Sequence, residues 1–308
     1  MAVAERLLAI QAQDWRELLL AVRARSQGLT AAEVIQVITG DRILLVSWLN
    51  RGTLHLVLSE DYSRVLALTP PPRMGAAFAR LAREGVTPDG AERGVSAISA
   101  ALLQEGPLTR AQLGERQATK GLAAPSPELL QLLFLASLRG KIVRGPMVGK
   151  TQAFVLVRDW IGSPSRASRE MSLVQLARRY LVGHAPANDR DLAQWAGIPL
   201  RDSRAGVRGL GSELRQRPDG LLELGSRRLR SALPRPRLLV PFDPLLLGWK
   251  SREPVLGSHR GVVYRERSLP THRTRGQPCR WNLAARRRNA DAAAVRSPDQ
   301  FGAPGAGS

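Results

Sequence analysis

The sequence predicts a mainly α fold with small β wings, an α+β architecture in which groups of helices are each followed by a β-hairpin. The chain has 308 residues, of which 44% are apolar, and this is enough material for two or three small cores. Amphipathic helices followed by short strands next to glycine recur three times along the chain. The recurrence of roughly 70 to 90 residues is too long for a solenoid repeat. We therefore expect three tandem winged-helix units.

The first unit is predicted to span residues 1–85. Its first helical stretch, residues 4–26, is expected to form one amphipathic helix or two short ones. Thr30 is a helix-capping residue type and should begin a helix over residues 31–38. A further apolar-periodic segment follows from Asp41, and Thr53 to Leu58 reads as a strand because Leu, Val and Thr follow a glycine.

The second and third units are predicted to span residues 86–162 and 168–258. Each shows three helical patterns, with a Pro-Leu-Thr cap in the second unit and an Asn188 cap in the third. Proline-rich linkers are expected at 70–72 and 163–165. The predicted helices are 96–104, 110–116, 127–138, 172–181, 189–196 and 203–210, and the predicted strands are 140–144, 153–157, 220–224 and 237–241.

Residues 259–308 differ from the rest of the chain. Ten arginines stand there against three acidic residues, with almost no apolar periodicity and an ending rich in Gly, Ala, Pro and Ser. Such a composition cannot bury enough apolar surface to fold by itself. We expect an aberrant, disordered, arginine-rich tail.

The charge of the whole chain is strongly positive, with 46 basic against 26 acidic residues and a net charge of +20. This balance favours a polyanionic partner, because each neutralised phosphate of a nucleic acid releases a condensed counterion. The alternative is that GC-biased coding has enriched arginine on a solvated surface. Without the tail the net charge is still +13, so the expectation of a nucleic-acid partner remains.

Several functional classes are disfavoured by composition. Cys279 is the single cysteine, which excludes an internal disulfide and a thiolate metal cage, and the four histidines lack the spacing of a helical zinc motif. We expect no metal and no cofactor. The apolar runs are too short to cross a bilayer, and Glu5 and Arg6 interrupt the position of a signal peptide, so a cytoplasmic protein is expected.

The segment from Gly145 to Thr151 resembles a phosphate-binding loop, but its glycines are separated by three residues where that motif has four. It also joins two predicted strands, whereas a phosphate loop leads into a helix. We reject nucleotide binding. The bases Lys141, Arg144 and Lys150 are instead interpreted as wing residues that contact DNA phosphates, with a solvated hairpin as an equally good alternative.

Other polar residues could have either a structural or a DNA-binding role. His55 lies in a predicted strand next to Arg51, where a histidine is more often structural, although the start of a wing would suit DNA contact. Trp249, Lys250 and Arg252 together offer an aromatic surface with positive charge, which suits an exposed base, but a tryptophan there is more often core. Asp243, within an apolar run, is interpreted as a turn cap before proline, since an unpaired buried carboxylate is costly.

Gln11 and Gln13 stand at the head of an apolar helical pattern. Residues i and i+2 of a helix lie about 200° apart and cannot share a face, whereas in an extended segment both point the same way. If both amides serve one site, the backbone there must be extended or lie at a helix break. By their chemistry alone, two surface glutamines carry no functional signal.

The order of motifs along residues 5–258 resembles the AlkZ-like winged-helix DNA glycosylase family of bacteria. The resemblance implies three tandem winged helices around a basic concave channel, and excision of bulky N7-alkylated purines and interstrand crosslinks from double-stranded DNA. The family signature is glutamine, any small or apolar residue, then glutamine or aspartate. The segments that carry the resemblance are 9–14, 48–57, 145–146, 159–160, 179–181 and 242–249.

The resemblance makes Gln11 and Gln13 the expected catalytic residues of a monofunctional, monomeric glycosylase. An N7-alkylpurine is cationic and already a good leaving group, so two amides can suffice by orienting water and lesion. No lysine lies near the motif, so a Schiff-base lyase step is not expected. The alternative is a non-catalytic winged-helix DNA-binding protein or a degenerate, inactive relative. Family members usually have another helix before the motif and further strands after residue 260. A misplaced start site would explain the first departure and a frameshift the second.

Overall fold

The computed structural model describes residues 1–69, 71–118, 127–163, 168–225 and 239–256. The chain divides into a main unit, Met1–Leu229 with Leu239–Lys250, and a second unit, Arg230–Leu238 with Ser251–Ser308. Within the second unit the structure describes one short helix, α14 (Glu253–Leu256). The predicted tail at 259–308, the start of the predicted strand 237–241 and most of the linker 163–165 lie outside the described residues.

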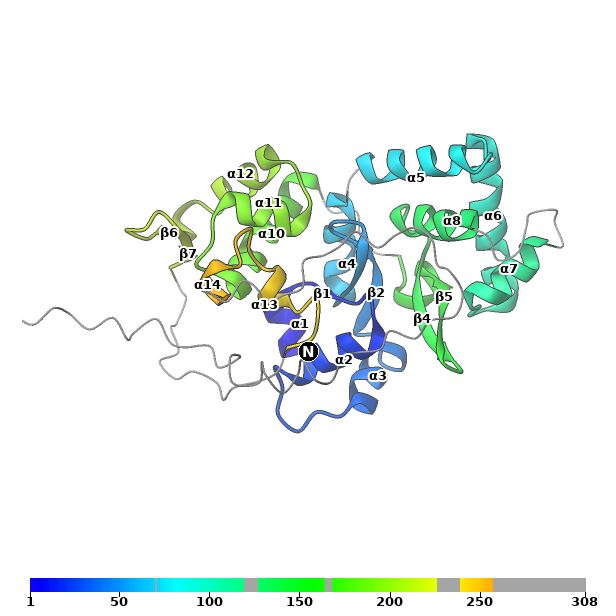
Figure 1. Cartoon of the computed structure of the whole chain (residues 1–308), viewed down its shortest axis with the longest axis horizontal. Helices are drawn as coiled ribbons and strands as arrows, with labels where there is room; N and C mark the ends of the chain where they lie inside the picture. The colour runs from blue at the N-terminus through cyan, green and yellow to red at the C-terminus, as the bar shows by residue number, and fades with distance from the viewer. Residues whose placement is uncertain (70, 119–126, 164–167, 226–238, 257–308) are drawn as a thin grey trace, which may run out of the picture. The chain divides into compact units, whose positions relative to one another are not determined.

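The main unit is a mixed α/β structure in which helices surround a small antiparallel sheet (Figure 1). Its elements in chain order are α1 (Ala2–Leu7), β1 (Ile10–Gln11), α2 (Trp15–Arg23), α3 (Ala31–Thr39), β2 (Leu44–Leu49), β3 (Thr53–Leu58), α4 (Ser59–Leu68), α5 (Pro71–Arg83), α6 (Pro88–Glu105), α7 (Arg110–Ala118), α8 (Pro127–Leu138), β4 (Ile142–Val148), β5 (Thr151–Leu156), α9 (Val157–Ile161), α10 (Arg169–His184), α11 (Asp189–Ala196), α12 (Leu200–Arg208), the 3-10 helix η1 (Gly211–Glu213), β6 (Leu214–Gln216), β7 (Leu222–Leu224) and α13 (Pro244–Leu247).

Helix starts with a side-chain cap were well predicted. Thr30 accepts a hydrogen bond from the Glu33 backbone while Glu33 reaches back to Thr30, and Asn188 and Asp191 form the same capping box before α11. The predicted helix 127–138 has the same bounds as α8. The proline-rich linker predicted at 70–72 is wrong for its last two residues, which begin α5, because proline fits the first turn of a helix where its missing N–H costs nothing.

The apolar-periodic segment after Asp41 contains a strand. β2 is buried along its whole length, since helices cover both faces of the sheet, and it therefore lacks the alternation of a half-buried strand. The predicted strand at 237–241 is wrong over its described part, because Leu239 to Pro241 form no strand. β7 pairs with β6 instead, which precedes it by a short turn, and the two make a separate two-stranded sheet.

The five-stranded sheet joins hairpins that the sequence placed in separate units. Its order is β1-β3-β2-β4-β5, and β2 meets β4 where Val46 pairs with Arg144. A first core lies on the face of the sheet that carries Val46 and Leu56, and a second core lies on the face that carries Leu45 and Val57. Strands from both sides of the boundary predicted at residue 85 thus share one sheet, and residues from both sides share the first core.

The second core connects the sheet to the helices α10 and α11. It contains Leu45 and Val57 from the sheet together with Tyr180 and Trp195 from these helices. The part of the chain predicted as a third unit is therefore packed against the first by shared apolar contacts. No helix among the described residues is long and apolar enough to cross a bilayer.

Asp243 is a turn cap, as predicted, and also the buried partner of an arginine. Its Oδ1 accepts a hydrogen bond from the Leu245 backbone N–H at 2.8 Å, and its Oδ2 accepts one from Arg25 Nη1 at 2.9 Å. The carboxylate is 0% exposed, whereas the Arg25 side chain is 22% exposed. This bidentate pair fastens the segment before α13 to the end of α2.

Two buried histidines lie in the second core or against it. His184 is 2% exposed and stacks on Tyr180 with ring centroids 4.7 Å apart. Burial lowers its pKa to about 4, and burial together with the nearby Arg51 guanidinium lowers the pKa of His55 to about 3. Both rings are therefore neutral at pH 7.

Removing Arg25 should leave the buried Asp243 charge without its partner. We expect Arg25→Met to lower the free energy of unfolding by about 3 kcal/mol in urea denaturation. The matched control is Arg217→Met, because the Arg217–Asp219 pair is exposed, with 36% and 46% of the side chains accessible, and should cost less than about 1 kcal/mol. Equal losses in the two variants would contradict the structural role of the Arg25–Asp243 pair.

The stability of the protein should fall in mild acid. Unfolded histidine titrates near 6.5 but folded His184 near 4, so between these values the unfolded state holds more protons and each fall in pH favours it. We expect His184 to account for a loss of about 2 kcal/mol between pH 7 and pH 5. The variant His184→Phe keeps an aromatic ring. Its free energy of unfolding, measured by urea denaturation, should fall by about 2 kcal/mol less than that of the wild type between pH 7 and pH 5. An unchanged pH dependence would disprove the assignment.

Candidate functional site

The glutamine motif lies in an extended segment between two helices. α1 ends at Leu7 and α2 begins at Trp15 behind an Asp14 cap, so Gln11 and Gln13 belong to neither helix. The segment pairs with β3, where Gln11 is opposite His55 and the Ala12 N–H donates to the Leu54 carbonyl at 2.8 Å. The backbone is therefore extended at Gln11 and bends at Gln13, and this break between two helices is the condition that the sequence set for both amides to serve one site.

Gln11 and Gln13 flank a buried residue at the end of β1. Ala12 is 5% exposed and belongs to the first core, so the residues on either side of it point away from that core. Gln11 is half-buried and Gln13 is exposed. Gln11 pairs with His55 of β3, and the Gln13 side chain accepts from the neighbouring Leu54, so both glutamines meet the same stretch of β3.

Both glutamine side chains are held through their carbonyl oxygens. Gln11 Oε1 accepts from Arg51 Nη2 at 3.4 Å, and Gln13 Oε1 accepts from the Leu54 backbone N–H at 3.3 Å. A guanidinium and a backbone N–H can only donate, so the partners themselves fix which end of each amide faces them. The amino group of Gln11 is left directed away from Arg51.

Arg51 links the glutamine motif to a helix far along the chain. It lies in the turn between β2 and β3, next to Gly52, whose φ is 81°. Its Nη1 donates to the carbonyl of Trp195 near the end of α11, while Nη2 faces Gln11. Residues 11, 51 and 195 are thus joined by one guanidinium. The sequence singled out Arg51 as a DNA contact, and the structure places it beside the motif.

His55 is the β3 residue that pairs with Gln11, and it is 2% exposed. On its other side it pairs with Ser47 of β2. Its Nδ1 lies 2.9 Å from the Thr53 carbonyl oxygen. With a pKa near 3, the ring carries no charge at pH 7 and offers no surface to a DNA phosphate. The structural interpretation of this histidine therefore fits its position better than the DNA-binding one.

Arg144 packs inward from the β4–β5 hairpin. Its guanidinium carbon lies 4.2 Å from the centre of the Phe154 ring and 5.3 Å from that of Trp48. Burial, and then the charge of nearby Arg110, lower its pKa to about 10. This residue was expected to reach DNA from the wing, but it covers the aromatic surface of the first core instead.

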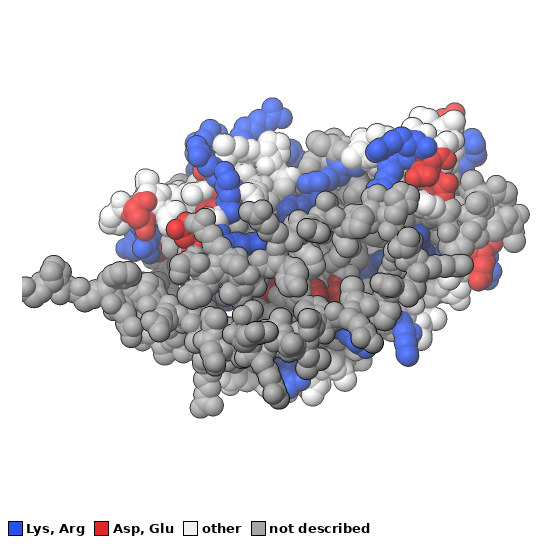
Figure 2. All heavy atoms as spheres, viewed as in Figure 1, with Lys and Arg blue, Asp and Glu red and all other residues white. Residues whose placement is uncertain are grey.

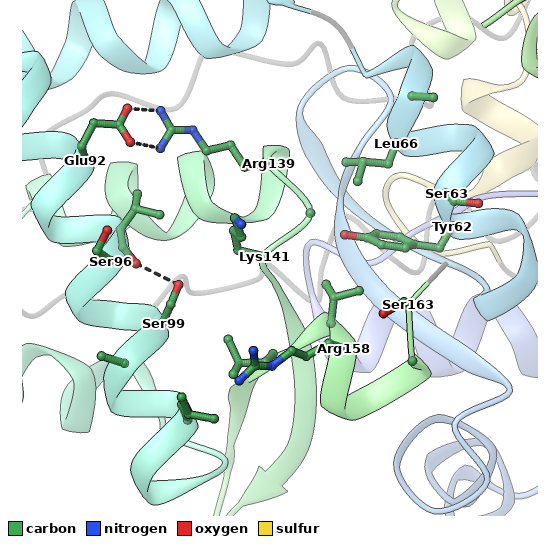
Figure 3. Close-up of a pocket in the computed structure, with 18 residues that line it drawn as sticks. Tyr62, Ser63, Leu66, Glu92, Ser96, Ser99, Arg139, Lys141, Arg158 and Ser163 are labelled. Atoms are coloured by element: carbon green, nitrogen blue, oxygen red, sulfur yellow. Dashed lines mark hydrogen bonds and ion pairs between the residues drawn. The ribbon is translucent and has the colours of Figure 1, made fainter. Parts of the chain in front are cut away.

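Lys150 and Lys141 lie at opposite ends of the same hairpin. Lys150 is exposed in the turn between β4 and β5, as a wing residue should be, while Lys141 directly precedes β4. Seven residues of strand separate the two ends, or about 20 Å. Lys141 lines a cavity of about 1020 Å³ together with Arg139, Arg158 and serines of α6 (Figure 3). Neither glutamine lines this cavity.

Trp249 is partly buried rather than displayed for a base. Its Nε1 donates to the Pro186 carbonyl at 3.1 Å, and its ring meets the edge of His184 at 5.6 Å between centroids. Lys250 is exposed, and its backbone N–H donates to Asp191 at 2.9 Å. Arg252 belongs to the second unit, where its carbonyl accepts from Leu256. The interpretation of Trp249 as a core residue therefore suits its contacts.

The arginines of α12 were not among the predicted DNA contacts. Three exposed arginines follow one another at intervals of three and four residues on this helix, which places them on one face. Figure 2 shows basic side chains gathered over α12 and over α5. The helical spacing was visible in the sequence and could have identified them. These residues are Arg201, Arg204 and Arg208.

Two carboxyl groups lie close to the glutamine motif in the sequence. Asp14 Oδ1 accepts hydrogen bonds from the Arg16 and Glu17 backbones at the start of α2, at 2.8 and 3.1 Å. Burial and the charge of Asp14 raise the pKa of Glu17. Asp14 therefore serves as the cap of α2. Glu17, whose raised pKa favours the protonated form, is the candidate general acid of this segment.

Comparisons with known proteins identify the family of this chain. A model of the AlkZ-like DNA glycosylase family matches residues 4–290. The structure is similar to the DNA glycosylase AlkZ of Streptomyces sahachiroi, with a TM-score of 0.69 and 24% identity over 86% of this chain and 76% of that one. No curated protein gives a significant match. The family match covers almost the whole chain, and the chain therefore belongs to the AlkZ-like family of DNA glycosylases.

Proposed function

We propose that the protein is a monofunctional DNA glycosylase that hydrolyses the N-glycosidic bond of bulky N7-alkylated purines and unhooks interstrand crosslinks that contain them. The observation that carries this proposal is the pair of amides at the break between α1 and α2, each held against the β2–β3 hairpin by an obligate donor. Neither amide can exchange a proton at neutral pH. Such a site suits a substrate that needs no protonation.

An N7-alkylpurine satisfies this requirement. Its positive charge disappears when the base leaves, so the departing group is neutral and the enzyme does not have to supply a general acid. The sugar becomes similar to an oxocarbenium ion, and a water must be in place to attack it. Positioning of that water can contribute several kcal/mol to lowering the barrier without any titrating group.

The hydrogen bonds suggest complementary roles for the two glutamines. Gln11 directs its amino group away from Arg51 and can donate to the oxygen of the attacking water. Gln13 Oε1 has a second lone pair besides the one that faces Leu54, and can accept a hydrogen bond from the same water, which releases its proton to solvent after it has attacked the sugar. An aspartate could also accept, which agrees with the family signature of glutamine or aspartate at the second position.

The surrounding fold supplies supporting features. The order of three helices followed by a hairpin appears twice, in α6–β5 and in α10–β7, which fits tandem winged helices. Basic side chains over α12 and α5 suit contact with double-stranded DNA (Figure 2). A Schiff-base lyase step needs a lysine at the site. None of the described lysines lies in β1 or in the β2–β3 hairpin beside the motif, so we propose no such step. We propose a cytoplasmic monomer that acts without a cofactor.

Replacing both glutamines should remove catalysis but not DNA binding. We expect Gln11→Ala with Gln13→Ala to abolish release of 7-methylguanine in a single-turnover assay, because the water loses both of its partners. Affinity for an undamaged duplex should stay within about threefold, since most of the binding comes from phosphate contacts elsewhere.

The matched control is Gln104→Ala, an exposed amide on α6, which should leave excision unchanged. Unchanged base release by the double variant would refute the assignment of the motif. If the wild-type protein binds duplex DNA but releases no base, the alternative of a non-catalytic winged-helix DNA-binding protein would hold instead.

A further inference from the structure

Arg73 lies near the glutamine motif. Its contacts give it no structural role. It belongs to the first turn of α5, which has no acidic residue. A cation at this end of a helix is disfavoured by the helix dipole. Among the described residues, no carboxylate lies within 4.0 Å of its guanidinium, in contrast to the many arginines that form ion pairs. Its positive charge is therefore uncompensated and only half exposed.

Two glycine turns make room for the Arg73 side chain. A Cβ atom at Gly52 would lie 3.4 Å from Arg73 Cδ, and one at Gly197 would lie 2.9 Å from Arg73 Nη2. Both glycines have positive φ, 81° and 68°, so the turns themselves also require glycine. The stem of Arg73 thus lies on the β2–β3 turn and its guanidinium reaches the end of α11.

The side chains of Arg73 and Arg51 both contact the backbone at Gly197. A Cβ at Gly197 would also lie 3.0 Å from Arg51 Cγ, so the Arg73 guanidinium and the Arg51 stem meet over this glycine. Arg51 in turn reaches Gln11. Arg73 is therefore separated from the catalytic motif by one side chain, on the surface where α5 and α12 bring further basic residues (Figure 2).

We propose that Arg73 binds a backbone phosphate of the DNA strand that carries the lesion, next to the nucleotide held by the glutamine pair. The proposal rests on the proposed function in taking DNA as the ligand. A phosphodiester is the group that suits this position, because a planar guanidinium can donate two parallel hydrogen bonds to its oxygens. Binding compensates the charge of Arg73 and fixes the register of the strand at the site.

The test measures the affinity for an undamaged fluorescent duplex by anisotropy between about 50 and 200 mM salt. Each phosphate contact adds about 0.9 to the slope of log affinity against log salt concentration. We expect Arg73→Gln to reduce this slope by about 1 and the affinity at the lowest salt by about tenfold. Arg73→Lys keeps the charge and should retain the slope.

Arg93→Gln is the matched control, because Arg93 is exposed on α6, outside the basic surface of α5 and α12, and lacks a carboxylate within 4.0 Å among the described residues. It should leave the slope unchanged, and both variants should unfold at the wild-type temperature. The proposal is overturned if Arg73→Gln keeps the wild-type slope, or if Arg93→Gln loses as much. The binding test uses undamaged DNA and is therefore independent of catalysis. A lowered slope in Arg73→Gln supports the phosphate contact even if the wild-type protein releases no base. Base release by the wild type together with an unchanged slope in Arg73→Gln refutes the phosphate contact but leaves the proposed function standing.

Discussion

The pairing of β1 with β3 is the constraint on which the candidate site depends. A strand of two residues between two helices takes Gln11 and Gln13 out of helical phase. The hydrogen bond from the Ala12 N–H to Leu54 and the burial of Ala12 in the first core hold this geometry. If the helix continued through the motif, the two amides would point about 200° apart and could not act on one water. The site therefore exists because the helix breaks here.

Arg51 extends this constraint to the rest of the main unit. The turn that carries it follows β2, α11 supplies the carbonyl of Trp195, and the guanidinium joins both to Gln11. The second core packs α10 and α11 against the same face of the sheet. A site assembled from residues near positions 11, 51 and 195 therefore requires the whole main unit to be folded, which explains why the motif is not a local feature of its first helices.

Local signals in the sequence predicted the fold only in part. Caps such as Thr30 and Asn188 located helix starts, because the capping hydrogen bonds involve residues three positions apart. β2 was not identified as a strand, since it is apolar on both faces, and the joining of two hairpins into one sheet depends on a single pairing between residues far apart. The inward packing of Arg144 on aromatic rings and the position of Arg73 between two glycine turns also arise from tertiary contacts. The helical spacing of the arginines on α12, in contrast, was present in the sequence.

In the proposed mechanism Gln11 is a donor to the water and Gln13 is an acceptor, and substitutions that keep a carboxyl oxygen but remove the N–H groups separate these roles. Single-turnover release of 7-methylguanine by Gln11→Glu should fall at least about a hundredfold, since a carboxylate can satisfy Arg51 but has no N–H to offer. Gln13→Asp should keep activity within about tenfold, because an acceptor remains. Glu17→Gln should have no effect if no general acid takes part. Equal losses for Gln11→Glu and Gln13→Asp, or loss of release in Glu17→Gln, would contradict the account.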